Sequence, residues 1–298
     1  MHNSTLYQQT LQLLENKLSL LSDKFEETLE STINACWLKA AGFPKSAENA
    51  LLNDLPNLSD SQELLFKEYI DNRLNNIPLA HITGRQQFFG IELLSDNRAL
   101  IPRKETELLA KKALELSWEI HENKYSVNAM DICCGAGNIG LSLAYYNPNI
   151  MVNATDLSED AVALTVDNIN FLNLHRRVRA KQGNLFSAFD KNYHNTVDII
   201  LCNPPYIPSH KVVNLHKETL INEPKIAFDG GISGVDIIGE FIQYAPQYLK
   251  VNGYILIEVG VGQGEFVSLL CKRTGFYNDV SSVVDVNGNI RVVIARKK

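Results

Sequence analysis

Residues 130–144 read MDICCGAGNIGLSLA, and this stretch decides the fold. An apolar run ends at Asp131, glycines follow at positions 135 and 137, and a helical pattern begins at Asn138. Glycine at such a strand-to-helix turn permits a tight bend and a close approach of the backbone to a nucleotide-like ligand. An ordinary turn has the same pattern, so these glycines alone leave both interpretations open.

A second carboxylate strengthens the ligand interpretation. Asp156 follows Asp131 by 25 positions and ends the next apolar run, in NATDLSED. Because neighbouring parallel strands end at one crevice, we expect Asp156 to accept both ribose hydroxyls of a bound nucleoside. Its other predicted role is to cap the following helix beside Ser158, and the two roles are compatible.

Strand-like and helical patterns alternate along the remainder of the chain. Strands are expected near 127–132, 150–155, 177–181, 197–202 and 254–259, and helices near 105–120, from 138, near 158–172 and near 235–249. This alternation predicts an α/β fold with a doubly wound, mostly parallel sheet. The ending VSSVVDVNGNIRVVIARKK instead predicts an antiparallel hairpin around Asn287 and Gly288.

The N-terminal region has a different character. Residues 1–77 show leucines at helical spacing and no strand pattern, whereas residues 84–100 contain short apolar runs broken by Gly90. We therefore expect a small all-helical domain over 1–77, a β-hairpin linker over 78–100 and the sheet domain over 101–298. Residues 1–85 carry seven basic and eleven acidic side chains, so the acidic excess lies mainly on the helical part.

The composition excludes several classes of protein. The 298 residues are 45% hydrophobic and 21% charged, as in folded globular proteins, and the net charge of −6 argues against direct nucleic-acid binding. We find neither a signal-peptide pattern nor an apolar run of membrane-spanning length. Five cysteines without ligand spacing support no disulfide framework and no metal site. We expect a cytoplasmic protein that does not bind membranes.

The glycine spacing also matches a dinucleotide fingerprint, G-x-G-x-x-G, through Gly135, Gly137 and Gly140. That match makes a nicotinamide-dependent enzyme an alternative. Asp131 upstream and the terminal antiparallel hairpin fit S-adenosylmethionine methyltransferases better.

The stretch DIILCNPPYIP, residues 198–208, carries the most specific chemistry. A proline pair can simply end a strand, because proline donates no ladder hydrogen bond. That interpretation leaves the flanking Asn203 and Tyr206 unexplained. Prolines 204 and 205 stiffen the loop, so the Asn203 carboxamide and the Pro204 carbonyl are free to accept both N–H bonds of a planar amino group. Tyr206 is placed to stack on that group.

At these residues the chain resembles the glutamine methyltransferases of peptide-chain release factors. The Asn-Pro-Pro-Tyr string is shared with other amino methyltransferases, including those of DNA adenine. Four further segments are similar to this family specifically: PLAHITGRQQFFG at 78–90, LIPRKETE at 100–107, EPKIAFDGGISG at 223–234 and DVNGNIR at 285–291. The resemblance covers roughly residues 73–298, and residues 1–72 match poorly.

The resemblance implies a monomeric enzyme that transfers a methyl group from S-adenosylmethionine to the side-chain amide nitrogen of a release-factor glutamine, with residues 1–77 recognising that protein. The implied catalytic residues are Asn203, Pro204, Pro205 and Tyr206. The implied cofactor-binding residues are Arg103, Thr106, Asp131, Cys133, Cys134, Gly135, Ala136, Gly137, Asp156, Leu157, Asn184, Leu185 and Asn203. A ribosomal protein or a small molecule as acceptor, and a nucleic-acid adenine methyltransferase, remain the alternatives.

Two cofactor residues depart from the family pattern. Cys133 replaces the usual first glycine of the loop, a change that is tolerable if φ there is negative. Asn184 stands where an aspartate is common, and it offers an acceptor without charge. Glu258, which ends the apolar run ILIEVG, fits either the site or a cap or loop contact.

Overall fold

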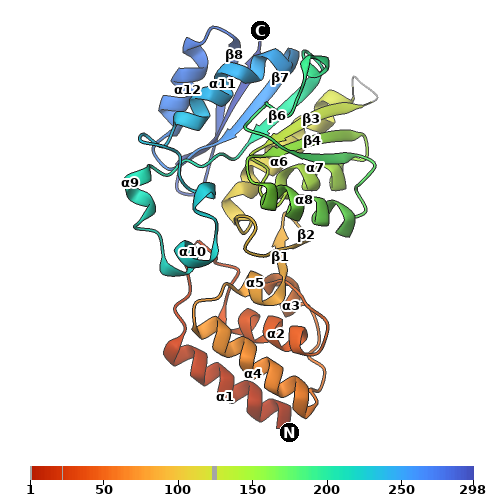
Figure 1. Ribbon diagram of the computed structural model, residues 1–298, viewed down its shortest axis with the longest axis vertical. Coiled ribbons are helices and arrows are strands. Elements are labelled where there is room, and N and C mark those ends of the chain that lie inside the picture. The colour runs from red at the N-terminus through yellow and green to blue at the C-terminus, as the bar shows by residue number, and fades with distance from the viewer. Residues whose placement is uncertain (1, 22, 123–125) are drawn as a thin grey trace. The chain divides into compact units, whose positions relative to one another are not determined.

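The computed structural model describes residues 2–21, 23–122 and 126–298 (Figure 1). These residues form two compact units. Unit 1 comprises residues 1–97, 101–104 and 216–223, and unit 2 comprises residues 98–100, 105–215 and 224–298. Residues 1 and 22 of the expected helical region, and 123–125 of the expected sheet domain, lie outside the described residues.

Unit 1 is mainly helical. It contains α1 (His2–Lys17), α2 (Leu29–Ala40), α3 (Ala47–Leu51), α4 (Asp60–Leu74), α5 (Leu79–Thr83), the antiparallel hairpin of β1 (Arg85–Phe88) and β2 (Ile91–Leu94), and α10 (Lys217–Asn222). Capping boxes at Thr28 and Ser59 begin α2 and α4. Trp37 lies in the core edge-on to Phe66, and its indole N–H donates to the Pro56 carbonyl at 2.8 Å.

A buried ion cluster lies inside unit 1, formed by Lys24, Glu27, Arg73 and Glu218. Glu218 accepts from Lys24 Nζ at 2.7 Å and from Arg73 Nη1 at 2.6 Å, and Arg73 Nη2 donates to Glu27 at 2.8 Å. All four side chains are almost completely buried. Glu218 belongs to α10, so a segment distant in sequence completes the interior of unit 1.

Unit 2 is built on a seven-stranded sheet of order β5-β4-β3-β6-β7-β9-β8. Strands β3 to β7 are parallel, whereas β9 runs antiparallel to both β7 and β8. The strands are β3 (Val127–Ile132), β4 (Ile150–Asp156), β5 (Val178–Gln182), β6 (Val197–Cys202), β7 (Leu249–Glu258), β8 (Tyr277–Val284) and β9 (Ile290–Lys297). This topology confirms the predicted fold class, including the terminal hairpin.

Helices cover the sheet of unit 2 on both faces (Figure 1). The α-helices of unit 2 are α6 (Glu107–His121), α7 (Asn138–Tyr146), α8 (Glu159–Phe171), α9 (Ser209–Val212), α11 (Asp236–Tyr248) and α12 (Gly264–Arg273), and η1 (Lys104–Thr106) leads into α6. Met130, Ile132, Ile200 and Cys202 share one core cluster with α11 and α12. Because side chains alternate along a strand, the intervening residues, such as Ala129 of β3 and Ile199 of β6, face the layer of α6, α7 and α8.

Strand register places the predicted site residues in one row. Ile132 pairs with Thr155 of β4 and with Cys202 of β6, and Cys202 pairs with Ile257 of β7. The next residue on each strand is therefore Cys133, Asp156, Asn203 or Glu258. Parallel strands present their carboxyl ends at one edge, which is where ligands bind in open α/β sheets.

Candidate active site

The glycine loop joins β3 to α7. Gly135 has φ +56° and Gly137 has φ +81°, a left-handed conformation that favours glycine. A Cβ on Gly137 would lie 2.8 Å from Thr165 Cγ2, so both the backbone conformation and the packing require glycine there. Nothing lies within 4 Å of a Cβ position on Gly135, which leaves that part of the loop open to a ligand.

Two side chains of α8 hold this loop in place. The Thr165 hydroxyl donates to the Gly135 carbonyl at 2.8 Å, and Asn168 Nδ2 donates to the Ala136 carbonyl at 3.0 Å. Both side chains are buried. Sequence reasoning missed these two residues, although polar side chains three positions apart on the apolar face of a helix were the available signal.

Asp131 of β3 is bonded to the helix that follows the glycine loop. It is fully buried, and the Gly140 N–H donates to its Oδ2 at 2.8 Å. Its Oδ1 is buried without a hydrogen-bond partner among the described residues. Burial raises the pKa of Asp131 to about 7, against the lowering effect of the Gly140 hydrogen bond. Asp131 thus contacts the backbone of the first turn of α7, and its predicted contact with a cofactor stays a prediction.

Asp156 joins the glycine loop to the start of α8. Its Oδ2 accepts from the Gly135 N–H and its Oδ1 from the Ser158 N–H, both at 2.9 Å. Ser158 itself caps α8 by accepting from the Ala161 N–H. Burial raises the pKa of Asp156, while the backbone hydrogen bonds lower it. A carboxylate offers about four acceptor positions, so these bonds leave it able to accept from a ligand.

Two residues at this edge have strained backbones. Cys133 has φ +61° and Leu185 has φ +48°, a region that residues with a Cβ rarely adopt. The negative φ that would make cysteine easily tolerated at position 133 is therefore not found, and Cys133 adopts a conformation that favours glycine. Leu185 is held by the Thr155 hydroxyl, which donates to its carbonyl at 2.9 Å. Backbone strain of this kind is concentrated at functional sites.

The other predicted cofactor residues differ in exposure. Leu157 and Asn184 are exposed, while Cys134 is buried, with its thiol 3.6 Å from the Thr165 hydroxyl. Burial raises the pKa of Cys134 well above its usual value, so its thiol is protonated. Arg103 belongs to unit 1, where it bonds Glu223 at 2.7 Å.

The Asn203–Tyr206 segment is braced from a second loop. The Ile207 N–H donates to the Phe228 carbonyl at 3.0 Å, and the Gly230 N–H donates to the Ile207 carbonyl at 2.9 Å. A Cβ on Gly230 would approach the Pro205 carbonyl oxygen to 2.6 Å. Gln263 Nε2 donates to the Tyr206 carbonyl at 2.9 Å. These contacts hold the proline segment rigidly at the end of β6.

The side chains of this segment reach two neighbours. Asn203 Nδ2 donates to Thr106 Oγ1 at 3.2 Å, and the Tyr206 hydroxyl donates to Glu258 Oε1 at 3.4 Å. Burial raises the pKa of Tyr206, and the nearby Glu258 raises it further, so its hydroxyl is protonated. Glu258 therefore contacts the Asn203–Tyr206 segment, and its role in the site stays a prediction.

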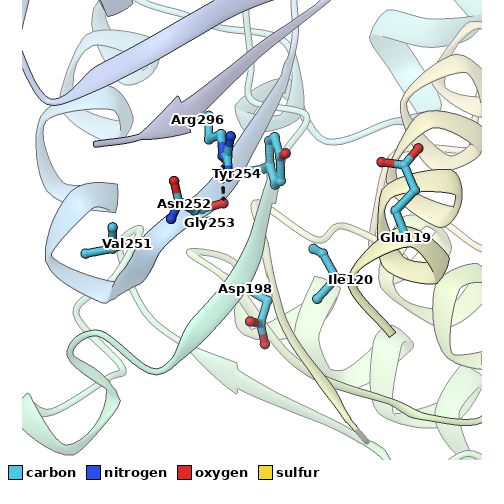
Figure 2. A pocket seen from close by; sticks show the side chains of 8 residues that line it. All are labelled: Glu119, Ile120, Asp198, Val251, Asn252, Gly253, Tyr254 and Arg296. Carbon is cyan, nitrogen blue, oxygen red and sulfur yellow. Dashed lines mark hydrogen bonds between the residues drawn. The ribbon is translucent and has the colours of Figure 1, made fainter. Parts of the chain in front are cut away.

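A pocket elsewhere in unit 2 contains none of these residues (Figure 2). It is lined by Glu119, Ile120, Asp198, Val251, Asn252, Gly253, Tyr254 and Arg296. Asp198 is the second residue of β6, so the pocket lies at the opposite end of that strand from Asn203.

In the described ranges, no group of three or more His, Cys, Asp or Glu side chains is arranged to hold a metal ion. The described helices include none that is long and apolar enough to cross a membrane.

The fold and the site can be compared with known proteins. A family model, the methyltransferase small domain, matches residues 112–231. Among solved structures, the hMettl16 catalytic domain in complex with a MAT2A 3′UTR hairpin is similar in fold, with a TM-score of 0.53 and 14% identity over 76% of this chain and 81% of that chain. Unit 2 therefore has the Rossmann-like fold that occurs in methyltransferases.

Sequence relatives narrow the class to one family. The chain is 32% identical to a release factor glutamine methyltransferase of Bacillus cereus over 245 residues, which are 82% of this chain and 85% of the relative. It is 31% identical to a protein of the same name from Geobacter sulfurreducens over 261 residues, 87% of each chain. The chain belongs to the release factor glutamine methyltransferase family, which confirms the resemblance found in its motifs.

Proposed function

We propose that this enzyme transfers a methyl group from S-adenosylmethionine to the side-chain amide nitrogen of a glutamine in a peptide-chain release factor. The observation that carries the proposal is the row of residues at the carboxyl edge of the sheet. The glycine loop and Asp156 lie on β3 and β4, and Asn203 follows the adjacent strand β6. A donor site and an acceptor site thus share one edge of one rigid sheet.

The residues of the donor half fit an adenosine-containing cofactor. The open backbone at Gly135 and the acceptor oxygens of Asp156 are suited to the methionine part and the ribose hydroxyls, respectively. Leu157, Asn184 and Leu185 follow β4 and β5 and are suited to the adenine. When bound, S-adenosylmethionine supplies an electrophilic methyl group on a sulfonium centre.

The acceptor half addresses the weak nucleophilicity of an amide. Asn203 Oδ1 and the Pro204 carbonyl would each accept a hydrogen bond from one N–H of the glutamine amide. The Tyr206 ring would pack on the plane of that amide. These contacts orient the nitrogen lone pair toward the methyl carbon. Orientation of this kind contributes up to about 7 to 11 kcal/mol to lowering a barrier.

The transfer conserves atoms and electrons without a redox step. The nitrogen lone pair forms the new N–C bond while the C–S bond breaks and its electron pair stays on sulfur. The nitrogen then loses one proton to solvent and returns to a neutral amide. The reaction therefore requires no metal ion and no strong general base.

The protein partner is assigned to the acidic N-terminal region. Residues 1–85 carry four more acidic than basic side chains, and complementary charge on a release factor would accelerate the encounter. We take the enzyme to act as a cytoplasmic monomer. Slower association at higher salt is the expected consequence.

Two matched variants test the assignment of the two halves. Asp156→Ala should weaken S-adenosylmethionine binding by roughly 10- to 100-fold, because hydrogen bonds to a charged group are lost. Asn203→Ala should leave donor affinity unchanged and lower the single-turnover rate on purified release factor by orders of magnitude. Calorimetry and transfer of radiolabelled methyl measure the two effects. A wild-type enzyme that modifies another glutamine-bearing protein and ignores release factors would refute the proposed substrate.

A further inference from the structure

Glu258 is a buried carboxylate in the acceptor half. It ends β7, is 2% exposed, and has one oxygen, Oε2, that is buried without a hydrogen-bond partner among the described residues. A buried carboxyl without full compensation is costly to the fold. Its presence beside Asn203 therefore points to a chemical role.

Thr106 connects Glu258 to Asn203. The Thr106 hydroxyl hydrogen-bonds to Glu258, and the same oxygen accepts from Asn203 Nδ2 at 3.2 Å. A hydroxyl has one proton, so a Thr106 that donates to the carboxylate must act as an acceptor toward Asn203. Thr106 is itself 2% exposed, which keeps water from replacing either partner.

We infer that Glu258 is a positioning residue that sets the orientation of the Asn203 carboxamide through Thr106. The ionised Glu258 accepts a hydrogen bond from the Thr106 hydroxyl, and the Thr106 oxygen accepts one from Asn203 Nδ2. Asn203 must then turn its Oδ1 away from Thr106. That oxygen is the one required to accept from the substrate amide. The inference rests on the proposed function of Asn203 and gives Thr106 a role other than its predicted contact with the cofactor.

The charge state of Glu258 sets the direction of this relay. Burial raises its pKa to about 7, and Glu105 raises it as well. Hydrogen bonds from Thr106 and Tyr206, together with Arg291 at 3.9 Å, act in the lowering direction. Below that pKa a protonated Glu258 becomes a donor to Thr106, Thr106 then donates to Asn203, and the carboxamide turns its NH2 group toward the substrate.

Variants of Thr106 test the relay through kinetics. Thr106→Val preserves shape but removes both hydrogen bonds, so kcat should fall by up to roughly 100-fold while donor affinity stays unchanged. Thr106→Ser restores the hydroxyl and should recover most of the rate. Equal rates for Thr106→Val and wild type would overturn the inference.

Glu258→Gln provides a test that a merely structural role would not satisfy. The wild-type kcat should decline as pH falls through about 7, and Glu258→Gln should lack this acidic limb. In the free protein, the side-chain amide NMR signals of Asn203, assigned with Asn203→Ala, should titrate in the same range in wild type but not in Glu258→Gln. A titration that persists in Glu258→Gln overturns the relay. The NMR experiment needs no acceptor, so failure of the release-factor assay would refute the proposed function separately.

Discussion

Buried carboxylates occur in both compact units, but their surroundings differ. In unit 1, Glu218 is buried against two cations, and Lys24 and Arg73 hold its pKa below the usual value even though burial alone would raise it. In unit 2, Asp131 and Glu258 are equally buried, each has an oxygen without a partner among the described residues, and burial raises the pKa of each to about 7. Two cations thus outweigh burial at Glu218, whereas burial raises the pKa of the less compensated carboxylates, including Glu27 of the same ion cluster. A raised pKa at the carboxyl edge of the sheet makes Glu258 and Asp131 candidates for a functional role.

The largest expected effect comes from breaking the paired cluster. Arg73→Met removes the cation shared by Glu27 and Glu218 and leaves buried negative charge uncompensated. The free energy of unfolding of unit 1 should fall by about 3 to 5 kcal/mol. Urea denaturation measures the loss, and Arg73→Lys, which keeps the charge, should lose less. An unchanged unfolding midpoint for Arg73→Met would show that the cluster does not stabilise unit 1.

A smaller effect, with a pH signature, is expected at the unpaired Asp131. Its pKa is about 7 in the folded state, against an ordinary value of 3.8, so the folded state holds the proton between these values. The resulting stabilisation is complete below pH 4 and is lost as pH rises through 7. Between pH 5 and pH 8, ligand-free Asp131→Asn should therefore gain roughly 3 kcal/mol of stability relative to wild type. Parallel pH profiles of unfolding for the two proteins would contradict the raised pKa.

The smallest effect is expected for an exposed pair in unit 2. Lys112 donates to Glu115 at 3.1 Å on α6, with about a third or more of each side chain exposed. Lys112→Ala should change the unfolding free energy by less than about 0.5 kcal/mol. A loss above about 1 kcal/mol in thermal unfolding would mean that burial is not what separates strong from weak pairs here.

Local patterns in the sequence predicted most of unit 2. The strand β3, the glycine turn and the start of α7 lie within a dozen residues, and each has its own signal in apolar runs, glycines and helical spacing. The start of strand β7 was predicted near Tyr254, whereas the strand begins at Leu249. Its first half was missed because it contains a polar stretch with Asn252 at φ +65°. The parallel register then followed from the strand order, which placed Asp156 and Asn203 at one edge.

What the sequence could not predict depends on distant pairs. Helix α10 has six residues and too little length for a clear periodicity, and its place in unit 1 depends on Glu218 meeting Lys24 and Arg73. The roles of Thr106 and Glu258 likewise depend on a contact between two segments that are remote in sequence. The left-handed Cys133 had no local signal either, since its residue type argued for the opposite φ.

The discontinuity of unit 1 has a consequence for how the chain is made. Arg73 precedes Glu218 by 145 residues and Lys24 precedes it by 194, so both cations leave the ribosome long before their shared carboxylate. The N-terminal helices cannot complete their interior when they emerge, because the missing anion belongs to a segment translated after most of the sheet strands. In a nascent chain arrested before residue 216, Lys24 and Arg73 would lack the carboxylate of Glu218. Its N-terminal helices should therefore be more sensitive to protease than those of the released protein.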